Sequence, residues 1–339
     1  DEFFEIRVAG VKQQVEAGVG SVTADGLSPT EAMARISEGA HELVAAQYRV
    51  FNEQLLPELQ AEGMRILFRA EWTDAVRRWA RDTFRESVLP VLTPVGLDPA
   101  HPFPSLLNKS LNFMISLQGR DAFGRSSRAA VVQAPRLLPR LMAVPEEIAG
   151  TPHAFVTLSG VIHDNVGDLF PGMDVQGCHP FRVTRDSDLW VDEEEVDDLL
   201  RALQGELRRR QFGDAVRIEV AQDCPEETAR FLLHHFELDR GDLYRVPGPV
   251  NLHRMAALYD LVDRPDLKFP SFVPAMTSLV KGDATPFDVI RAGDVLMHHP
   301  FDSFAPVIEM LQIAARDPKV LAIWVTLYRT GAESPLTDA

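Results

Sequence analysis

Residues 90–104 read PVLTPVGLDPAHPFP, and this stretch separates two parts of the chain with different sequence patterns. It contains five prolines: Pro90, Pro94, Pro99, Pro102 and Pro104. Proline lacks the backbone N–H that a helix needs, and its ring clashes with the preceding turn. No helix is therefore expected to run through this stretch, and we expect different architectures on its two sides.

The residues before the proline-rich stretch predict an N-terminal helical bundle. Residues 1–17 place apolar side chains at helical spacing. Ser28-Pro29-Thr30-Glu31 has the residues of a capping box, with proline in the first helical turn. The long helix that starts there is expected to kink or end at Pro57. A further helix is expected at 74–88, after a short strand at 64–68.

Beyond residue 104 the sequence alternates between short apolar runs and amphipathic segments, which is typical of an α+β domain. Strands are expected at 111–117, 129–133, 154–158, 180–184 and 216–221. Helices are expected at 160–170, 193–210 and 226–236. Residues 245–286 are rich in proline and are expected to form loops.

Residues 290–328 show a third pattern. A strand is expected at 294–299, a helix at 303–316 and a second strand at 320–328. The last segment is apolar throughout, as in a strand that is covered on both faces. The pattern predicts one βαβ unit of an α/β domain. One such unit cannot bury its own faces, so we expect the domain to continue beyond Ala339.

The composition is globular and acidic. Hydrophobic residues make up 45% and charged residues 25%, and the formal net charge is -16. Such a chain repels DNA, RNA and anionic lipid at long range, so we expect no nucleic-acid partner. A polyanion would need a local basic channel. Arginine greatly outnumbers lysine, which suits phosphate binding, although a bias in gene base composition explains the same excess.

Two cysteines, Cys178 and Cys224, provide no disulfide framework and no zinc-finger spacing, so both are expected to be reduced. No apolar run approaches the ~18–20 residues that span a bilayer. The first residues lack the pattern of a signal peptide. A cytoplasmic protein is expected, and the missing initiator methionine suggests that the chain starts inside a longer one.

Several familiar catalytic motifs are absent from the sequence. It contains no Gly-x-x-x-x-Gly-Lys-[Ser/Thr], Gly-x-Gly-x-x-Gly, His-Glu-x-x-His or Gly-x-Ser-x-Gly. None of the ten histidines is followed two residues later by lysine, so a His-x-Lys phosphotransfer signature is missing as well. His298-His299, at an expected strand end, is consistent with a phosphate contact or with a core position. His234-His235 is expected to have a surface or core role.

Arginines close two expected elements of the α+β part. Arg182 and Arg185 end the 180–184 strand, and they would bind phosphate or pair with the nearby carboxylates of Asp186 and Asp188. Arg208-Arg209-Arg210 ends the 193–210 helix, where its charges suit the helix dipole; gripping a polyanion is the alternative.

Two further segments are candidates for a site. The turn His101–Lys109 is braced by prolines and would present hydrogen-bond donors rigidly or form the corner between two domains. Arg329 falls at the carboxyl end of the last expected strand, where open α/β sheets place ligands. A guanidinium there would clamp a transferring phosphoryl group.

Several stretches resemble class-1 polyphosphate kinases, in the same order along the chain. They are Asp1–Gly10, His101–Asn112, Phe170–Met173, Phe181–Asp188, Asp294–Phe304 and Thr326–Gly331. The resemblance covers essentially the whole chain, and several collinear matches are far more specific than one short motif. A departure occurs at Trp324-Val325, where the family usually has a polar-containing run.

The resemblance implies the activity and the partners. Members reversibly move the terminal phosphate of ATP onto inorganic polyphosphate, with Mg²⁺, through a phosphohistidine. ATP, ADP, polyphosphate and a second copy of the chain are therefore the expected partners, and peripheral membrane association is compatible with the family. Residues 1–65 would be the N-terminal helical domain, 66–285 the middle α+β dimerisation domain, and 286–339 the truncated start of the first phospholipase-D-like catalytic domain.

The resemblance places few site residues in this chain. The catalytic histidines would lie beyond Ala339, so the chain alone is expected to be inactive. Arg329 matches a family arginine at the Mg²⁺ and phosphate site; because a guanidinium has no lone pair for a cation, we interpret it as a phosphate clamp beside the metal. A non-catalytic dimerising or scaffold module and a phospholipase-D-like hydrolase fragment stay as alternatives.

Overall fold

The computed structural model describes residues 1–20, 26–97, 103–119, 128–187, 213–276 and 285–325. The chain divides into two compact units, Asp1–Val262 and Asp263–Ala339, and each is treated by itself. Among the described residues, no helix combines the length and the apolar character needed to cross a bilayer.

The first unit begins with the expected helices. A π-helical segment, Phe3–Val8, leads into α1 (Ala9–Glu16), and α1 packs against α2 (Pro29–Val50). The predicted capping box is present at the start of α2. The backbone N–H of Glu31 donates to Ser28 Oγ at 3.3 Å, and the backbone N–H of Ser28 donates to the Glu31 carboxylate at 2.9 Å.

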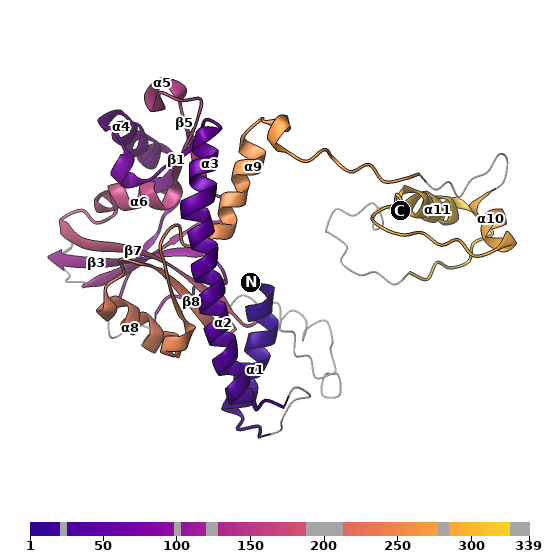
Figure 1. Ribbon diagram of the computed structural model, residues 1–339, viewed down its shortest axis with the longest axis horizontal. Helices are drawn as coiled ribbons and strands as arrows, with labels where there is room; N and C mark the ends of the chain where they lie inside the picture. The colour runs from indigo at the N-terminus through magenta and orange to yellow at the C-terminus, as the bar shows by residue number, and fades with distance from the viewer. Residues whose placement is uncertain (21–25, 98–102, 120–127, 188–212, 277–284, 326–339) are drawn as a thin grey trace. The chain divides into compact units, whose positions relative to one another are not determined.

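Of the two outcomes expected at Pro57, a kink or an end, the helix does not end there. A π-helical turn at Phe51–Leu55 follows α2, and α3 (Leu56–Ala61) continues past the proline, so that α2 and α3 form one long rod in Figure 1. Proline breaks an α-helix because its ring meets the carbonyl four residues before it. That carbonyl belongs to Glu53, inside the π-turn, where the hydrogen bonding is wider and relieves the clash.

Two sheets form the body of the first unit. The smaller sheet has the order β1-β6-β5, from Met64–Leu67, His153–Thr157 and Leu141–Val144. The larger sheet has the order β2-β4-β3-β7-β8-β9, from Pro94–Gly96, Ala129–Ala134, Leu111–Gly119, Met173–Arg185, Ala215–Ala221 and Leu243–Val246. Its neighbours pair antiparallel except β8 and β9, which are parallel.

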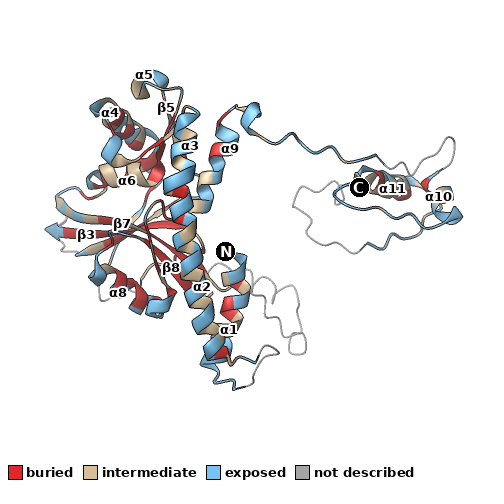
Figure 2. Ribbon diagram, viewed as in Figure 1, coloured by how far each residue is buried: buried red, intermediate tan, exposed pale blue. Residues whose placement is uncertain are grey.

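The larger sheet is buried on both faces. On β3, Phe113 and Ile115 contribute to one apolar cluster, together with Val76 of α4 (Asp74–Thr83) and Val161 of α6 (Leu158–Asn165). The alternate residue Met114 faces a second cluster, formed with α8 (Glu226–His235). Figure 2 shows the buried residues concentrated on the strands and on the helix faces toward them.

Most of the predicted elements of this unit are confirmed. The expected strands correspond to β1, β3, β4, β6, β7 and β8, and the expected helices to α1, α2, α4 with Phe84–Val88, α6 with Val166–Leu169, and α8. The helix expected at 193–210 lies outside the described residues. Strands β2, β5 and β9 were not expected, because three or four residues are too few to show an alternating pattern.

Short helices complete the described chain. In the first unit they are Arg69–Glu71, Leu89–Val91, α5 (Glu146–Ala149), Arg240–Asp242, Leu252–Ala257 and α9 (Leu258–Leu261). In the second unit they are Pro265–Leu267, α10 (Pro286–Ala292) and α11 (Ala305–Arg316). The helix expected at 303–316 is therefore confirmed as α11.

The two strands expected around α11 were wrong for the described residues. Residues 294–299 and 320–325 form no strand, and 326–328 lie outside the described residues. The apolar side chains Leu296, Leu321 and Trp324 are each more than nine-tenths exposed. A strand is stable only beside partner strands, and the described part of this unit contains a single β-bridge, between Ala275 and Asp302. The start of a phospholipase-D-like domain is not evident here.

Helix α2 is fixed to the segment that follows β9. Tyr48 is 1% exposed, and its hydroxyl donates to the carbonyl of Pro249 at 2.7 Å. Asn52, one turn later, donates to the carbonyl of Pro247 at 2.8 Å. Gly248 lies between these prolines, and a Cβ there would approach the Tyr48 ring to 3.1 Å. A larger residue at this point would require the Tyr48 ring to shift by a few tenths of an ångström.

We predict that Tyr48→Phe lowers the free energy of unfolding by about 1–2 kcal/mol, because the buried carbonyl of Pro249 loses its donor. Urea denaturation of the chain measures this change. Leu43→Ala on the same helix is the control; Leu43 is 71% exposed, and its change should stay within about 0.5 kcal/mol. Equal effects of the two substitutions would contradict the prediction.

Candidate functional site

Strands β7 and β8 bring three charged side chains together in the interior. Arg182 on β7 lies opposite Glu219 on β8, and its Nη1 donates to Glu219 Oε2 at 2.7 Å. Arg217, two residues before Glu219, points to the same side of β8 and donates to the same oxygen at 3.4 Å. All three residues are at most 6% exposed. Such buried charges are stable only when they are paired.

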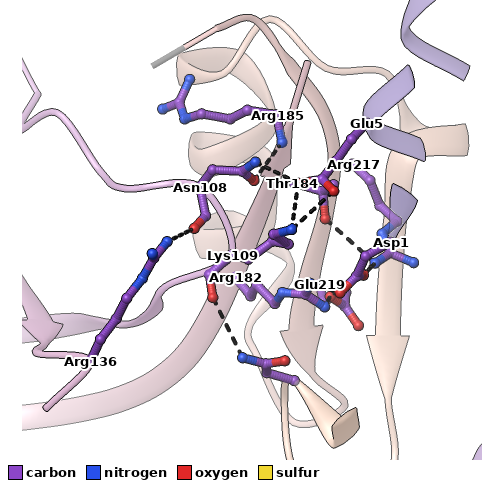
Figure 3. Close-up of polar contacts among 11 residues, drawn as sticks. Asp1, Glu5, Asn108, Lys109, Arg136, Arg182, Thr184, Arg185, Arg217 and Glu219 are labelled. Carbon is purple, nitrogen blue, oxygen red and sulfur yellow. Dashed lines mark hydrogen bonds and ion pairs between the residues drawn. The ribbon is translucent and has the colours of Figure 1, made fainter. Parts of the chain in front are cut away.

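The first residue of the described chain completes this cluster. Arg182 Nη2 donates to Asp1 Oδ2 at 2.6 Å, and Arg217 Nη2 donates to Asp1 Oδ1 at 2.9 Å. The Arg217 guanidinium also lies 4.2 Å from the ring centroid of Phe4 and 5.5 Å from that of Tyr244. The two arginines therefore hold the N-terminal segment against the larger sheet (Figure 3).

A second group of contacts surrounds Glu5. Its carboxylate accepts from Asn108 Nδ2 at 2.6 Å and from Lys109 Nζ at 2.9 Å. Asn108 in turn accepts from the backbone N–H of Arg185 at its Oδ1, at 2.9 Å, and from Arg136 Nη2 at its carbonyl, at 2.7 Å. Figure 3 shows these residues converging from the N-terminal helix, the turn before β3 and the end of β7.

The arrangement has more cations than carboxylates and is largely dry. Burial lowers the pKa of Arg217, whereas the carboxylate of Glu219 acts in the opposite direction. In the described part of the chain, the Nε atoms of Arg182 and Arg217 are buried without a partner. Guanidinium groups stay protonated and are not nucleophiles. The cluster can therefore position segments and attract anions, but its side chains make and break no bonds.

The structure brings together two of the predicted motifs. Asn108 and Lys109, from the turn His101–Lys109, meet the end of the strand that carries Arg182 and Arg185. Arg182 pairs with two carboxylates that are distant in sequence, those of Asp1 and Glu219. Arg185 donates to the carbonyls of Leu106 and Gly213. Asp188, one of the two carboxylates predicted as partners, lies outside the described residues.

Each of the two histidine pairs has contacts within its own unit. His299 contacts the carbonyl of Asp302 through Nδ1 at 2.9 Å, and the His298 ring lies 4.9 Å from that of Phe301. The His235 ring stacks on Phe103 at 3.9 Å, and both His234 and His235 are exposed on α8. The second pair thus has the surface position that was expected.

Two predicted site segments lie outside the described residues: Arg208-Arg209-Arg210, and the stretch that contains Arg329. Within the described ranges, no group of three His, Cys, Asp or Glu side chains is placed to hold a metal ion. Mg²⁺ prefers oxygen ligands in octahedral geometry. The described residues therefore form no ready-made ligand cluster of that kind, and a guanidinium such as that of Arg329 cannot be a ligand.

Sequence reasoning missed Glu5, Arg136, Arg217 and Glu219. One signal was present for two of them. Arg217 and Glu219 are two residues apart in a run of apolar residues, so both point to the same face of β8, which is covered. Charges on a covered face require partners across the sheet. Glu5 and Arg136 lacked such a signal, because their partners are distant in sequence.

We predict that Arg182→Met lowers the free energy of unfolding by about 3–5 kcal/mol, because it leaves Glu219 and Asp1 without their shortest partner in the interior. Arg230→Met is the matched control; the Arg230 side chain is 64% exposed, so the loss of its surface ion pair should change stability by less than about 1 kcal/mol. Urea denaturation of both variants tests this difference, and an Arg182 effect as small as the control's would refute the structural role.

Comparison with known proteins relates this architecture to one family. Family profiles of the polyphosphate kinase N-terminal domain, middle domain and C-terminal domain 1 match residues 1–67, 75–258 and 285–339. The chain is 51% identical to a polyphosphate kinase of Pseudomonas aeruginosa and 50% identical to one of Neisseria meningitidis serogroup B, over all 339 residues. These residues amount to 49% and 50% of the two relatives, so the chain spans about half of their length.

A solved structure shows the same fold. The crystal structure of polyphosphate kinase from Porphyromonas gingivalis matches 99% of this chain with a TM-score of 0.72, at 22% sequence identity, and the match covers 47% of that protein. The similarity in sequence to the two relatives extends over the whole chain, and the profiles follow one another along it. The chain belongs to the polyphosphate kinase family.

Proposed function

We propose that this chain supplies the N-terminal and middle parts of an enzyme that reversibly transfers the terminal phosphate of ATP to inorganic polyphosphate. The observation that carries the proposal is the 51% identity, over the whole chain, to a protein named polyphosphate kinase. The transfer would pass through a phosphohistidine. None of the ten histidines here lies in a His-x-Lys sequence, so the phosphorylated histidine is expected in the part of the relatives that this chain does not match.

The proposed domain boundaries lie close to those of the three family profiles. We propose residues 1–65 as the N-terminal helical domain, 66–285 as the middle domain that supports a homodimer, and 286–339 as the start of the first catalytic domain, of the phospholipase-D-like kind. The profile matches at 1–67, 75–258 and 285–339 support these limits. Cytoplasmic location, with peripheral membrane association, completes the proposal.

Phosphoryl transfer depends mainly on positioning and on neutralising the charge of the transferring group. From this chain, Arg329 is the residue that we propose for that task, as a clamp on the phosphoryl oxygens. Mg²⁺, when bound with ATP, would screen the phosphate charge, and its ligands are expected elsewhere in the complete enzyme. The buried pairing of Arg182, Glu219 and Asp1 would keep the N-terminal segment in place during the reaction.

The rival functions predict different chemistry. A scaffold would take up no phosphate, and a phospholipase-D-like hydrolase would release product without retaining the terminal phosphate of ATP. The test is to join this chain to the C-terminal half of the Pseudomonas aeruginosa relative and to incubate the product with γ-³²P-labelled ATP and Mg²⁺. A protein adduct that is labile in acid and stable in base, together with labelled polymer, is expected; an unlabelled protein would exclude the proposed reaction.

We predict that the 339-residue chain by itself forms no polymer from ATP, because it lacks a His-x-Lys nucleophile. Labelled polymer that is separated from ATP by size, after incubation with γ-³²P-labelled ATP and Mg²⁺, measures this, with the joined protein as the positive control. Polymer synthesis by the chain alone would overturn both the fragment interpretation and the assigned position of the nucleophile.

We predict that Arg329→Gln in the joined protein lowers kcat by about 10²–10³-fold with a smaller change in KM, because the clamp acts on charge that develops in the transition state. Arg329→Lys should recover part of the rate, since it restores the charge without the bidentate geometry. Arg316→Gln, at the exposed end of α11, is the control and should leave kcat within about twofold. An unchanged kcat in Arg329→Gln would remove this residue from the mechanism.

A further inference from the structure

Three arginines on two neighbouring segments of the first unit have no carboxylate partner. Arg136 and Arg140 lie in the connection between β4 and β5, and Arg254 lies in the 3-10 helix Leu252–Ala257. Other arginines of this unit, such as Arg77 with Asp164 and Arg85 with Asp168, form ion pairs at 2.7 and 2.8 Å. Within the described residues, these three form none. In the described part of the chain, Arg78 and Arg81 on α4 also form no ion pair, but Arg136, Arg140 and Arg254 are close enough for their charges to repel one another.

Apolar packing fixes Arg140 and Arg254 close to each other. Leu141, directly after Arg140, belongs to a buried cluster with Phe155 and Leu258, and Met255, directly after Arg254, packs against the same cluster. The backbone of Arg140 is also held in place, since its carbonyl accepts from the N–H of Leu158 at 3.0 Å. The core therefore sets the backbone positions of the two arginines, although their positive charges repel each other.

Arg136 joins the group through the turn before β3. Its Nη2 donates to the carbonyl of Asn108 at 2.7 Å, as Figure 3 shows. The carbonyl of the next residue, Lys109, accepts from Asn251 Nδ2 at 3.5 Å, and Asn251 lies three residues before Arg254. The same two-residue segment thus contacts both sides of the group. The charge of Lys109 is neutralised by Glu5, whereas the charges of the arginines are not.

Arg140 carries the clearest sign of a missing partner. Its Nη2 reaches the carbonyl of Ala134 at 3.4 Å, but its Nη1 is buried and has no partner among the described residues. Burial, and then the positive charges of Arg254 and Arg136, lower the pKa of Arg140 to about 10. The surroundings thus disfavour its charged form, because burial and the two neighbouring cations all act against it. An anion placed against Nη1 would offset it.

We propose that Arg136, Arg140 and Arg254 form a binding site for the phosphate groups of an anionic ligand. A phosphate group offers three oxygen acceptors, and guanidinium forks bind such oxygens in pairs. Arg136 and Arg254 are exposed, so a ligand can reach the group from solvent, while Arg140 supplies the buried donor. The proposal that an anion binds here is based on the contacts of these three arginines. The proposal that the anion is a phosphate is based on the proposed function.

Isothermal titration of the 339-residue chain with sodium tripolyphosphate at low salt tests the site directly. We expect saturable binding that weakens as salt is added, because the attraction is electrostatic. Arg254→Gln and Arg140→Met should each raise Kd by about tenfold or more, as expected when a charge-assisted hydrogen bond is lost. Arg81→Gln removes one positive charge from an exposed position on α4 and should change Kd by less than about twofold.

Thermal unfolding of the same proteins provides the second measurement. Tripolyphosphate should raise the unfolding midpoint of the unmodified chain and of Arg81→Gln, and should raise that of Arg254→Gln clearly less at the same concentration, because binding stabilises the folded state by mass action. Arg254 is exposed, so this variant is expected to fold even if Arg140→Met does not. Equal binding by Arg254→Gln, Arg81→Gln and the unmodified chain would overturn the site.

Three further ligands define its chemistry. Titration with inorganic phosphate and with ADP shows whether the site also accepts a single phosphate or a nucleotide, besides a free phosphate chain. Binding of either ligand at the arginines supports the site. Tricarballylate carries three carboxylates, and binding as tight as that of tripolyphosphate would refute the phosphate preference. Absence of binding by every ligand would refute the site itself. These measurements involve no turnover, so their failure leaves the transferase proposal intact, and an inactive joined protein leaves the site intact.

Discussion

The pairing of Arg182 with Glu219 across β7 and β8 is the constraint on which the first unit depends. Both charges are buried in a sheet that is covered on both faces, so each is stable only while the other is in register. A slip of one residue in β8 would turn Glu219 to the opposite face and leave Arg182 with Asp1 alone. The ion pair therefore fixes the register of the strands and the position of the N-terminal segment together.

The contacts of the N-terminal segment also explain which positive charges have a carboxylate partner and which do not. The N-terminal segment neutralises Arg182 and Arg217 through Asp1, and Lys109 through Glu5. The connection between β4 and β5 receives no such partner, and the packing of Leu141 and Met255 nevertheless holds Arg140 and Arg254 in place. A fold that keeps a buried guanidinium donor unpaired gives up stability at that position, which is typical of a binding site.

In the described part of the second unit, apolar residues lack the packing partners that the first unit provides. Its sequence has the apolar runs of strands, but Leu296, Leu321 and Trp324 are exposed there and no strand forms. Apolar alternation predicts a strand only if a neighbouring strand is available to complete the hydrogen bonding. The described part of this unit offers these residues only the single bridge between Ala275 and Asp302.

The sequence by itself determined the helices, their caps and most strands of the first unit, because periodicity and capping residues act over a few neighbours, as Ser28 and Glu31 show. It also determined the family, through motifs spread over the chain. The tertiary structure alone decided that Pro57 stays within a helix, that Arg182 pairs with Asp1 rather than Asp186, and that Arg136, Arg140 and Arg254 share one region. Contacts between residues far apart in sequence depend on register and packing, which no local pattern records.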